Sequence, residues 1–219
     1  MTEARTDALT GISNRRAFDQ EVRRLFAQRK RQGVTFSLLL ADVDHFKLFN
    51  DYHGHQVGDE MLRQVANTFD RTMRDMDLVC RYGGEEFAIL LPGTRLKEAL
   101  RAAQRANAAV ERVTYRLNDA QLNVTASIGA VEVLENESVE SFIERVDSAL
   151  YAAKLAGRNC VCYHNGERCF PASVPPETVA KSVSPPAPQN LDSLAHEIDR
   201  ELPEDLPADE SESETLVSA

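Results

Sequence analysis

The sequence predicts an α/β (α+β) domain in which helices surround a mixed, five-stranded sheet that includes one antiparallel hairpin. First, the spacing of apolar residues changes along the chain, from about 3.6 in some segments to two or to continuous runs in others. Second, these segments follow the order β-α-β-β-α-β-α-β after a first helix, which mixes crossovers with one hairpin. Third, 42% of the 219 residues are hydrophobic and 27% are charged, as expected of a chain with its own core.

The N-terminal elements follow from capping residues and apolar spacing. A helix is predicted to begin after Ser13, whose hydroxyl can cap it, and to stop before Gly33. Residues 34–41 are apolar almost throughout, which predicts a central strand covered on both faces. We expect a loop to follow, and then a second amphipathic helix around residues 61–69.

A hairpin is predicted in the middle of the chain. Residues 78–82 and 85–91 form two extended segments, and Gly83-Gly84 joins them as a tight two-residue turn would. Apolar spacing then predicts two helices and two further strands, namely helices at 96–113 and 139–155, a long strand at 123–133 and a short one at 160–163.

The acidic charge is confined to the C-terminal segment. The formal net charge is −10, but residues 1–169 hold 23 basic and 24 acidic side chains, whereas residues 170–219 hold 2 and 11. The latter segment also holds eight of the nine prolines. Such a composition cannot bury enough apolar surface to offset chain entropy. We therefore expect a domain over residues 1–168 and a disordered, acidic, Pro-rich tail over residues 169–219.

One apolar stripe interrupts that tail. Four residues recur at helical spacing and predict a short helix over residues 191–202, namely Leu191, Leu194, Ile198 and Leu202. Two interpretations stay open, because short helices are weak alone. The helix either docks on a protein partner or forms only transiently in a solvated tail.

Several classes of protein are excluded. The apolar runs are far shorter than the roughly 20 residues of a membrane span, and the N-terminus has no basic segment followed by an apolar one. We expect a cytoplasmic protein with neither a membrane nor a nucleic acid as partner. The four cysteines lack the spacing of a zinc site and are interpreted as packing residues. The P-loop and the Rossmann glycine motif do not occur.

Carboxylates stand at two predicted strand ends. Asp42 closes the buried strand, while Glu85 and Glu86 open the second strand of the hairpin. A carboxylate at the end of an apolar strand is costly to leave unpaired, and a hard divalent cation with oxygen ligands is one natural partner. Spacing alone leaves a second interpretation open, in which these are solvated acids beside a turn.

Residues 83–87, Gly-Gly-Glu-Glu-Phe, closely resemble the signature of GGDEF domains, the catalytic domains of bacterial diguanylate cyclases, in its Glu-containing form. The resemblance extends over most of residues 7–163 and implies a fold like that of nucleotide cyclases and polymerase palm domains. Four further motifs follow the family's order, namely Asp7 to Arg16, Asp42 to Lys47, Asn50 to Asp59 and Tyr151 to Asn159.

The resemblance implies that two GTP molecules condense into cyclic di-GMP with release of two pyrophosphates across a two-fold homodimer. It also implies that Asp42, the carbonyl of Val43 and Glu85 hold Mg²⁺, with Mn²⁺ as an alternative, and that Glu86 lies near the metal or the phosphates. We expect Glu85 to assist deprotonation of the attacking 3′-hydroxyl.

The resemblance further assigns substrate-binding positions. Asn50 and Asp59 match positions that read guanine, and Asp59 favours GTP over ATP because adenine lacks the N1–H and N2 donors. His55 matches another position of that loop, where a turn histidine bonded to the backbone stays an open alternative. Lys47, Lys154 and Arg158 match positions near the phosphates in the family. The backbone amides of His45 and Phe46 are expected to bind the same phosphates.

A second site is implied on the N-terminal side of the hairpin. Arg74 and Asp77 form an R-x-x-D motif shortly before Gly83, and Arg105 matches an accessory arginine on the next helix. The resemblance implies an inhibitory site for the product. Arginine suits it because a guanidinium can bond guanine O6 and N7 and stack on the base.

Assembly and activity leave alternatives. Only six residues precede Asp7, so the domain either dimerises weakly by itself, or is a fragment, or is assembled by a separate protein or by the tail. A module that senses cyclic di-GMP without making it is one alternative function, and a protein that interacts through its tail is another. The intact residues 83–87 favour the enzyme.

Overall fold

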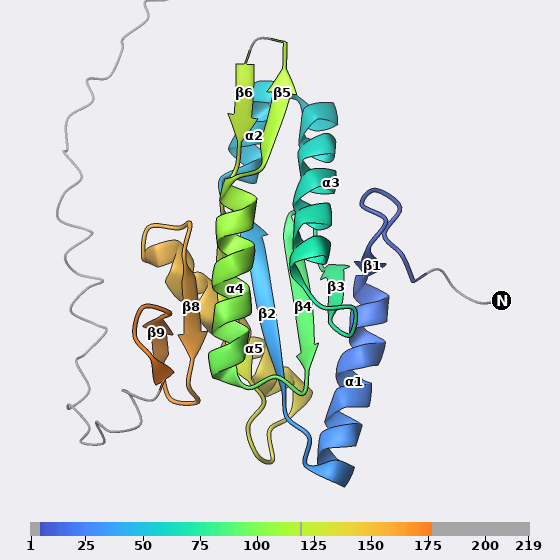
Figure 1. Ribbon diagram of the computed structural model, residues 1–219, viewed down its shortest axis with the longest axis vertical. Coiled ribbons are helices and arrows are strands. Elements are labelled where there is room, and N and C mark those ends of the chain that lie inside the picture. Colours follow the sequence, from blue (N-terminus) through green and yellow to red (C-terminus); the bar gives the residue numbers. More distant parts are fainter. Residues whose placement is uncertain (1–4, 119, 177–219) are drawn as a thin grey trace, which may run out of the picture. The chain divides into compact units, whose positions relative to one another are not determined.

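The computed structural model describes residues 5–118 and 120–176. Within them a seven-stranded sheet has the order β1-β3-β4-β2-β7-β8-β9, and β5 and β6 form a separate two-stranded ribbon (Figure 1). The central strand β2 (Phe36–Val43) runs antiparallel to both β4 (Glu86–Pro92) and β7 (Ala126–Glu132). The prediction of a mixed sheet surrounded by helices is confirmed.

Five helices pack around this sheet in the described residues. They are α1 (Arg15–Gln32), α2 (Phe46–His53), α3 (His55–Thr72), α4 (Leu96–Glu111) and α5 (Val139–Leu155). The remaining strands are β1 (Ser13–Asn14), β3 (Leu78–Arg81), β5 (Thr114–Leu117), β6 (Ala120–Asn123), β8 (Val161–His164) and β9 (Cys169–Pro171).

The core lies on both faces of β2, because successive side chains of a strand point to opposite sides. Leu39 and Ala41 pack with residues of α3 and α4 on one face, while Leu38 and Leu40 pack with residues of α1 and α5 on the other (Figure 1). Every residue of β2 is buried, as the apolar run predicted. None of the described helices combines the length and the apolar character that a membrane crossing requires.

The sheet has seven strands rather than the predicted five. The two additional strands have two and three residues, too few for a periodic pattern, and they are defined by their pairing with β3 and β8. The predicted domain ends at residue 168, and the structure places β9 beyond that residue, with a hydrogen bond of 3.1 Å from the Tyr163 hydroxyl to the Val174 carbonyl. Residues 177–219, with the predicted helix at 191–202, lie outside the described residues.

Three local predictions differ from the structure. The predicted loop after β2 contains α2, an eight-residue helix without a side-chain cap that stops at Gly54, where φ is 82°. The predicted strand at 123–133 corresponds to β7, which begins only at Ala126, while Asn123 is the last residue of β6. The cap of α1 is Asn14, whose side chain accepts from the Ala17 amide at 3.1 Å, and not Ser13. The helix α1 ends before Gly33, as predicted, and Gly33 adopts the left-handed conformation.

The connection between β3 and β4 is wider than the predicted two-residue turn. It spans Tyr82 to Glu85, and the amides of Tyr82 and Gly83 donate to the Glu86 carbonyl at 2.8 and 3.2 Å. Neither Gly83 nor Gly84 has a positive φ, whereas a tight primed turn requires at least one. Gly83 instead leaves room for a neighbouring side chain, because a Cβ atom there would collide with the Glu86 carboxylate.

Candidate active site

The predicted carboxylates meet where β2 ends and β4 begins. Asp42 lies opposite Glu86 in the β2–β4 ladder, and the Val43 amide donates to the Glu85 carbonyl at 3.2 Å. Asp42 is only 9% exposed, because it lies between β4 and β7 within the sheet. The tertiary structure therefore brings Asp42, Glu85 and Glu86 together at one end of the sheet, as their positions at the strand ends predicted.

One ammonium group faces these carboxylates. The Nζ atom of Lys154, from the last turn of α5, lies 2.9 Å from Oδ2 of Asp42. Burial raises the pKa of Glu85, repulsion from Asp42 and Glu86 raises it further, and the charge of Lys154 opposes the rise. The carboxylates thus outnumber their cation, a charge balance that suits a divalent cation with oxygen ligands.

The side chains alone do not complete a metal site. Among residues 5–118 and 120–176, no group of three His, Cys, Asp or Glu side chains is placed to hold a metal ion. A cation bound by Asp42 and Glu85 would therefore need other oxygen ligands, which the Val43 carbonyl and the phosphates of a nucleotide can supply. The residues present fit such a shared site.

Asp44 is a structural centre of the site that sequence reasoning missed. Its carboxylate accepts hydrogen bonds from the hydroxyls of Thr125 and Ser127, each at 2.7 Å, and from the Asn159 amide at 3.0 Å. The start of α2 is thereby tied to β7 and to the segment after α5. The two-residue spacing from Asp42 was a usable signal, since such residues face the same side of a strand.

Asn159 was likewise missed. It has a left-handed φ of 44°, and its side chain donates to Glu111 at 3.0 Å. Its own side-chain oxygen is buried without a hydrogen-bond partner. The preceding Gly157 and Arg158, both with positive φ, mark a tight turn that brings Asn159 back to Asp44.

Asn50 lies against a glycine on the neighbouring helix. Its Oδ1 atom is buried without a hydrogen-bond partner, and a Cβ atom at Gly58 of α3 would overlap that oxygen. A buried, unsatisfied amide oxygen is costly and calls for a donor. The absence of a side chain at Gly58 therefore leaves room for the Asn50 amide group.

The other predicted substrate residues surround α2 and the end of α5. His45 precedes α2 in the left-handed conformation, with φ of 54°. The Phe46 side chain is buried in the core, which leaves only its backbone for a ligand. Four predicted side chains form no hydrogen bond or ion pair within the described part of the chain, namely Lys47, His55, Asp59 and Arg158.

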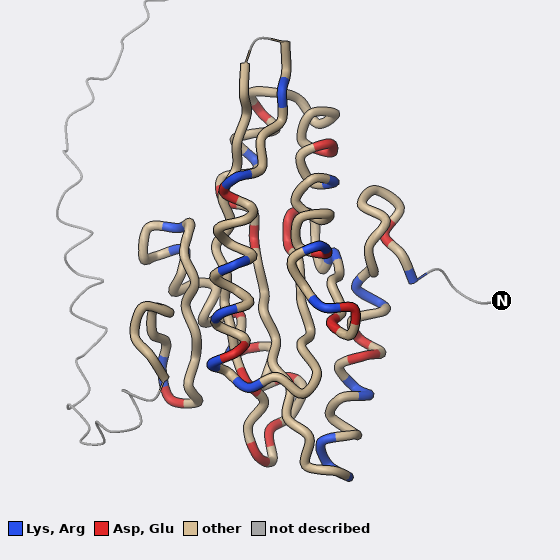
Figure 2. Tube along the Cα trace, in the orientation of Figure 1, with Lys and Arg blue, Asp and Glu red and all other residues tan. Residues whose placement is uncertain are grey.

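The R-x-x-D motif forms a compact turn after α3. The Arg74 amide donates to Oδ2 of Asp77 at 2.9 Å, while Oδ1 is buried without a partner. Burial raises the pKa of Asp77, and the charges of Arg74 and Arg105 act in the opposite direction. Arg74 and Asp77 thus contact each other, the charge of Arg105 reaches Asp77, and further basic positions lie along α4 (Figure 2).

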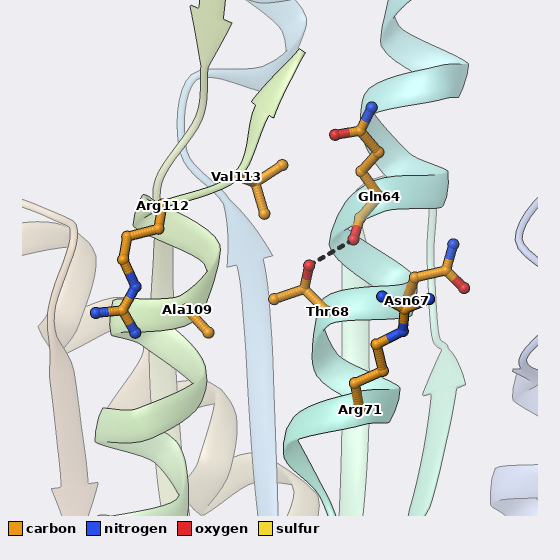
Figure 3. A pocket seen from close by; sticks show the side chains of 7 residues that line it. All are labelled: Gln64, Asn67, Thr68, Arg71, Ala109, Arg112 and Val113. Atoms are coloured by element: carbon orange, nitrogen blue, oxygen red, sulfur yellow. Dashed lines mark hydrogen bonds between the residues drawn. The ribbon is translucent and has the colours of Figure 1, made fainter.

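A separate polar hollow of about 380 Å³ lies between α3 and α4 (Figure 3). It contains none of the predicted site residues and no carboxylate. The Thr68 hydroxyl donates to the Gln64 carbonyl at 2.7 Å, so this polar group is satisfied within α3. The hollow is lined by Gln64, Asn67, Thr68, Arg71, Ala109, Arg112 and Val113.

Known proteins resemble this chain over the same region. Residues 4–160 match the family profile described as "Diguanylate cyclase, GGDEF domain". Diguanylate cyclase DgcP of Pseudomonas aeruginosa is 39% identical over 157 residues, which are 72% of this chain and 23% of that protein. Response regulator PleD of Caulobacter vibrioides is 41% identical over 159 residues, 71% of this chain and 35% of that protein. The chain thus covers less than half the length of either relative.

Solved structures agree with this fold. The diguanylate cyclase SiaD of Pseudomonas aeruginosa, solved in complex with its activator SiaC, has a TM-score of 0.71 and 37% identity, covering 73% of this chain and 61% of SiaD. The GGDEF domain of DgcB from Caulobacter crescentus, solved in complex with c-di-GMP, has a TM-score of 0.69 and 38% identity, covering 73% of this chain and 95% of that domain.

Proposed function

This chain belongs to the GGDEF family of diguanylate cyclases, and we propose that it condenses two molecules of GTP into cyclic di-GMP. In each of two steps a 3′-oxygen forms a bond to an α-phosphorus, the bond to the β-phosphate breaks, and pyrophosphate leaves with the 3′-proton released. The proposal rests mainly on one observation, namely that Asp42 and Glu85 lie together at the end of the sheet and that Lys154 forms an ion pair with Asp42.

A divalent cation, which we propose to be Mg²⁺ and which Mn²⁺ could replace, would be held by Asp42, the Val43 carbonyl and Glu85. When bound, it neutralises the phosphates and polarises the α-phosphorus. Lys154 adds positive charge beside the same phosphates. Glu85 is our candidate for the group that accepts the 3′-hydroxyl proton, because it would lie beside the reacting phosphates.

Guanine recognition is assigned to Asn50 and Asp59. The unsatisfied oxygen of Asn50 can accept from the base, and its amide can donate to it. The Asp59 carboxylate can accept from guanine N1–H and the N2 amine, which adenine cannot offer. The phosphates would be bound by Lys47, Lys154 and Arg158 and the amides of His45 and Phe46, with His55 on the same loop and Glu86 beside the metal.

Two further parts of the proposal concern assembly and regulation. Each domain offers one carboxylate pair and therefore one substrate, so we propose that two copies face each other as a homodimer. Arg74, Asp77 and Arg105 would bind the product and inhibit synthesis. The orphan Oδ1 of Asp77 supports this, since it can accept from a guanine N–H.

The proposal is tested by incubating the purified chain with GTP and Mg²⁺ at several protein concentrations and quantifying cyclic di-GMP by chromatography. A rate that rises faster than linearly with protein concentration is expected for a dimer. Asp42→Ala and Glu85→Ala should abolish product while thermal unfolding stays close to that of the wild type. Arg24→Ala, on the exposed side of α1, is the control and should keep activity. A folded chain that binds cyclic di-GMP but makes none at any concentration would instead be a sensor.

A further inference from the structure

Arg81, the last residue of β3, connects the catalytic hairpin to the N-terminal loop. Its Nε and Nη2 atoms both donate to the Gly84 carbonyl, at 3.1 and 2.7 Å. Its Nη1 atom lies 3.3 Å from Oδ1 of Asp7. The side chain is 18% exposed and that of Asp7 is 22% exposed, so the ion pair is partly buried, whereas the two hydrogen bonds to Gly84 lie at the surface.

The carbonyl that Arg81 holds belongs to the peptide that leads into Glu85. On its other side, the Glu85 carbonyl accepts from the Val43 amide at 3.2 Å. The backbone on either side of Glu85 is thus attached to two different strands. Glycines at 83 and 84 would otherwise leave this segment with much conformational freedom, because glycine loses more backbone entropy on ordering than other residues do.

The partner of Arg81 is itself held firmly. Oδ1 of Asp7 also accepts from the amide and the hydroxyl of Thr10, at 2.9 and 2.7 Å. The Asp7 amide donates to the Ile12 carbonyl at 2.8 Å, and Ile12 is buried in the core. The loop from residue 7 to residue 12 is therefore closed by its own hydrogen bonds and fixed to the domain.

We propose that Arg81 is a positioning residue, which the Asp7 carboxylate orients and which fixes the Gly84–Glu85 peptide so that the Glu85 carboxylate meets Asp42. This inference rests on the proposed function, in which Glu85 and Asp42 share a divalent cation. The N-terminal motif that begins at Asp7 would then contribute to the site through Arg81. Removing the guanidinium would release the turn while every proposed cation ligand stays in the chain. Outer partners of this kind affect metal affinity by about 10- to 100-fold.

The test compares the full chain with Arg81→Ala and Arg81→Lys. Mn²⁺ alone is titrated into each protein and followed by electron paramagnetic resonance, and the Mg²⁺ concentration that gives half-maximal synthesis is measured at saturating GTP. We expect Arg81→Ala to weaken Mn²⁺ binding and to raise the Mg²⁺ requirement by about 10-fold or more. The Mn²⁺ affinity of Arg81→Lys should lie between those of the wild type and Arg81→Ala, because an ammonium cannot bond Gly84 and Asp7 with the same fork of donors.

Arg63→Ala is the matched control. Arg63 donates to the Leu9 carbonyl of the same loop at 3.2 Å but not to the hairpin, so its removal should leave Mn²⁺ binding unchanged. Equal Mn²⁺ affinity in the wild type and in a folded Arg81→Ala variant would overturn the proposal, as would the same loss in Arg63→Ala. If Arg81→Ala does not fold, Arg81→Lys and Asp7→Asn decide, and unchanged affinity in both overturns it. Failure of the wild type to make cyclic di-GMP would refute the proposed function, and the Mn²⁺ comparison would still test the role of Arg81.

Discussion

The ammonium group of Lys154 lies 2.9 Å from a carboxylate oxygen of Asp42, although Lys154 is in the last turn of α5 and Asp42 is near the end of β2. The pair joins the C-terminal motif of the domain to the first motif of its predicted metal site. Without a cation, Lys154 is the group that offsets the repulsion between Asp42 and Glu85.

Replacing Lys154 by methionine should lower the rate of cyclic di-GMP synthesis by about 10- to 100-fold. The substitution keeps most of the apolar stem but removes the charge beside Asp42, so the folded state should persist. The measurement is the turnover rate together with a thermal unfolding curve. Lys30→Met, in the last turn of α1, is the control, and equal rates in the two variants would exclude a role for Lys154.

Replacing Gly58 by alanine should raise the KM for GTP by about 10-fold, because the new methyl group would displace the Asn50 side chain and cost roughly one hydrogen bond to guanine. Alanine is otherwise the better helix former, so stability should not explain the effect. Asn67→Ala, further along α3, is the comparison. An unchanged KM for GTP in Gly58→Ala would place guanine recognition elsewhere.

The two glycines of the hairpin should differ in their tolerance of alanine. A Cβ atom at Gly83 would collide with the Glu86 carboxylate, whereas one at Gly84 meets no atom within 4 Å. Gly83→Ala should therefore move Glu86 and reduce turnover more than Gly84→Ala does, with similar unfolding temperatures. The reverse order of turnover rates would show that the position of Glu86 does not limit the reaction.

Removing Arg105 should raise the cyclic di-GMP concentration needed for half-maximal inhibition by about 10-fold, the scale of one lost bidentate contact to guanine. The charge of Arg105 acts on Asp77, and both residues belong to the product site that we propose. Arg112→Ala, at the C-cap of α4, serves as the control. Identical inhibition curves for Arg105→Ala and the wild type would remove Arg105 from the product site.

Acid should destabilise the domain partly through Asp7. Burial acts to raise the pKa of Asp7, but hydrogen bonds from Thr10 and the charge of Arg81 outweigh it and hold that pKa below its ordinary value of 3.8. A carboxyl with a lowered pKa in the folded state stabilises it above pH 3.8, and this contribution is lost as the pH falls through the folded-state pKa. The free energy of unfolding, measured with urea from pH 7 to pH 3, should fall less steeply for Asp7→Asn. Parallel curves for both proteins would contradict this.

Much of the fold could be predicted because the spacing of apolar residues indicates which side chains are buried. Residues 139–155 have helical spacing and form α5 with those bounds. The apolar run after Gly33 forms β2, which is covered on both faces. The carboxylates at the ends of β2 and β4 could likewise be located from the strand ends alone. In these cases the spacing of apolar and charged residues within a single helix or strand is enough to predict the element.

Tertiary structure alone decided the partnerships between elements. The strands β1 and β9 are defined by pairing with β3 and β8. The eight residues of α2 carry too little periodicity to be distinguished from a loop. The contacts of Lys154 with Asp42, of Asp44 with Asn159 and of Arg81 with Gly84 join segments far apart in the chain or on opposite sides of a turn. Local spacing determines which face of an element is apolar, but which polar groups meet depends on how those faces pack, because each polar contact requires both partners to be in place.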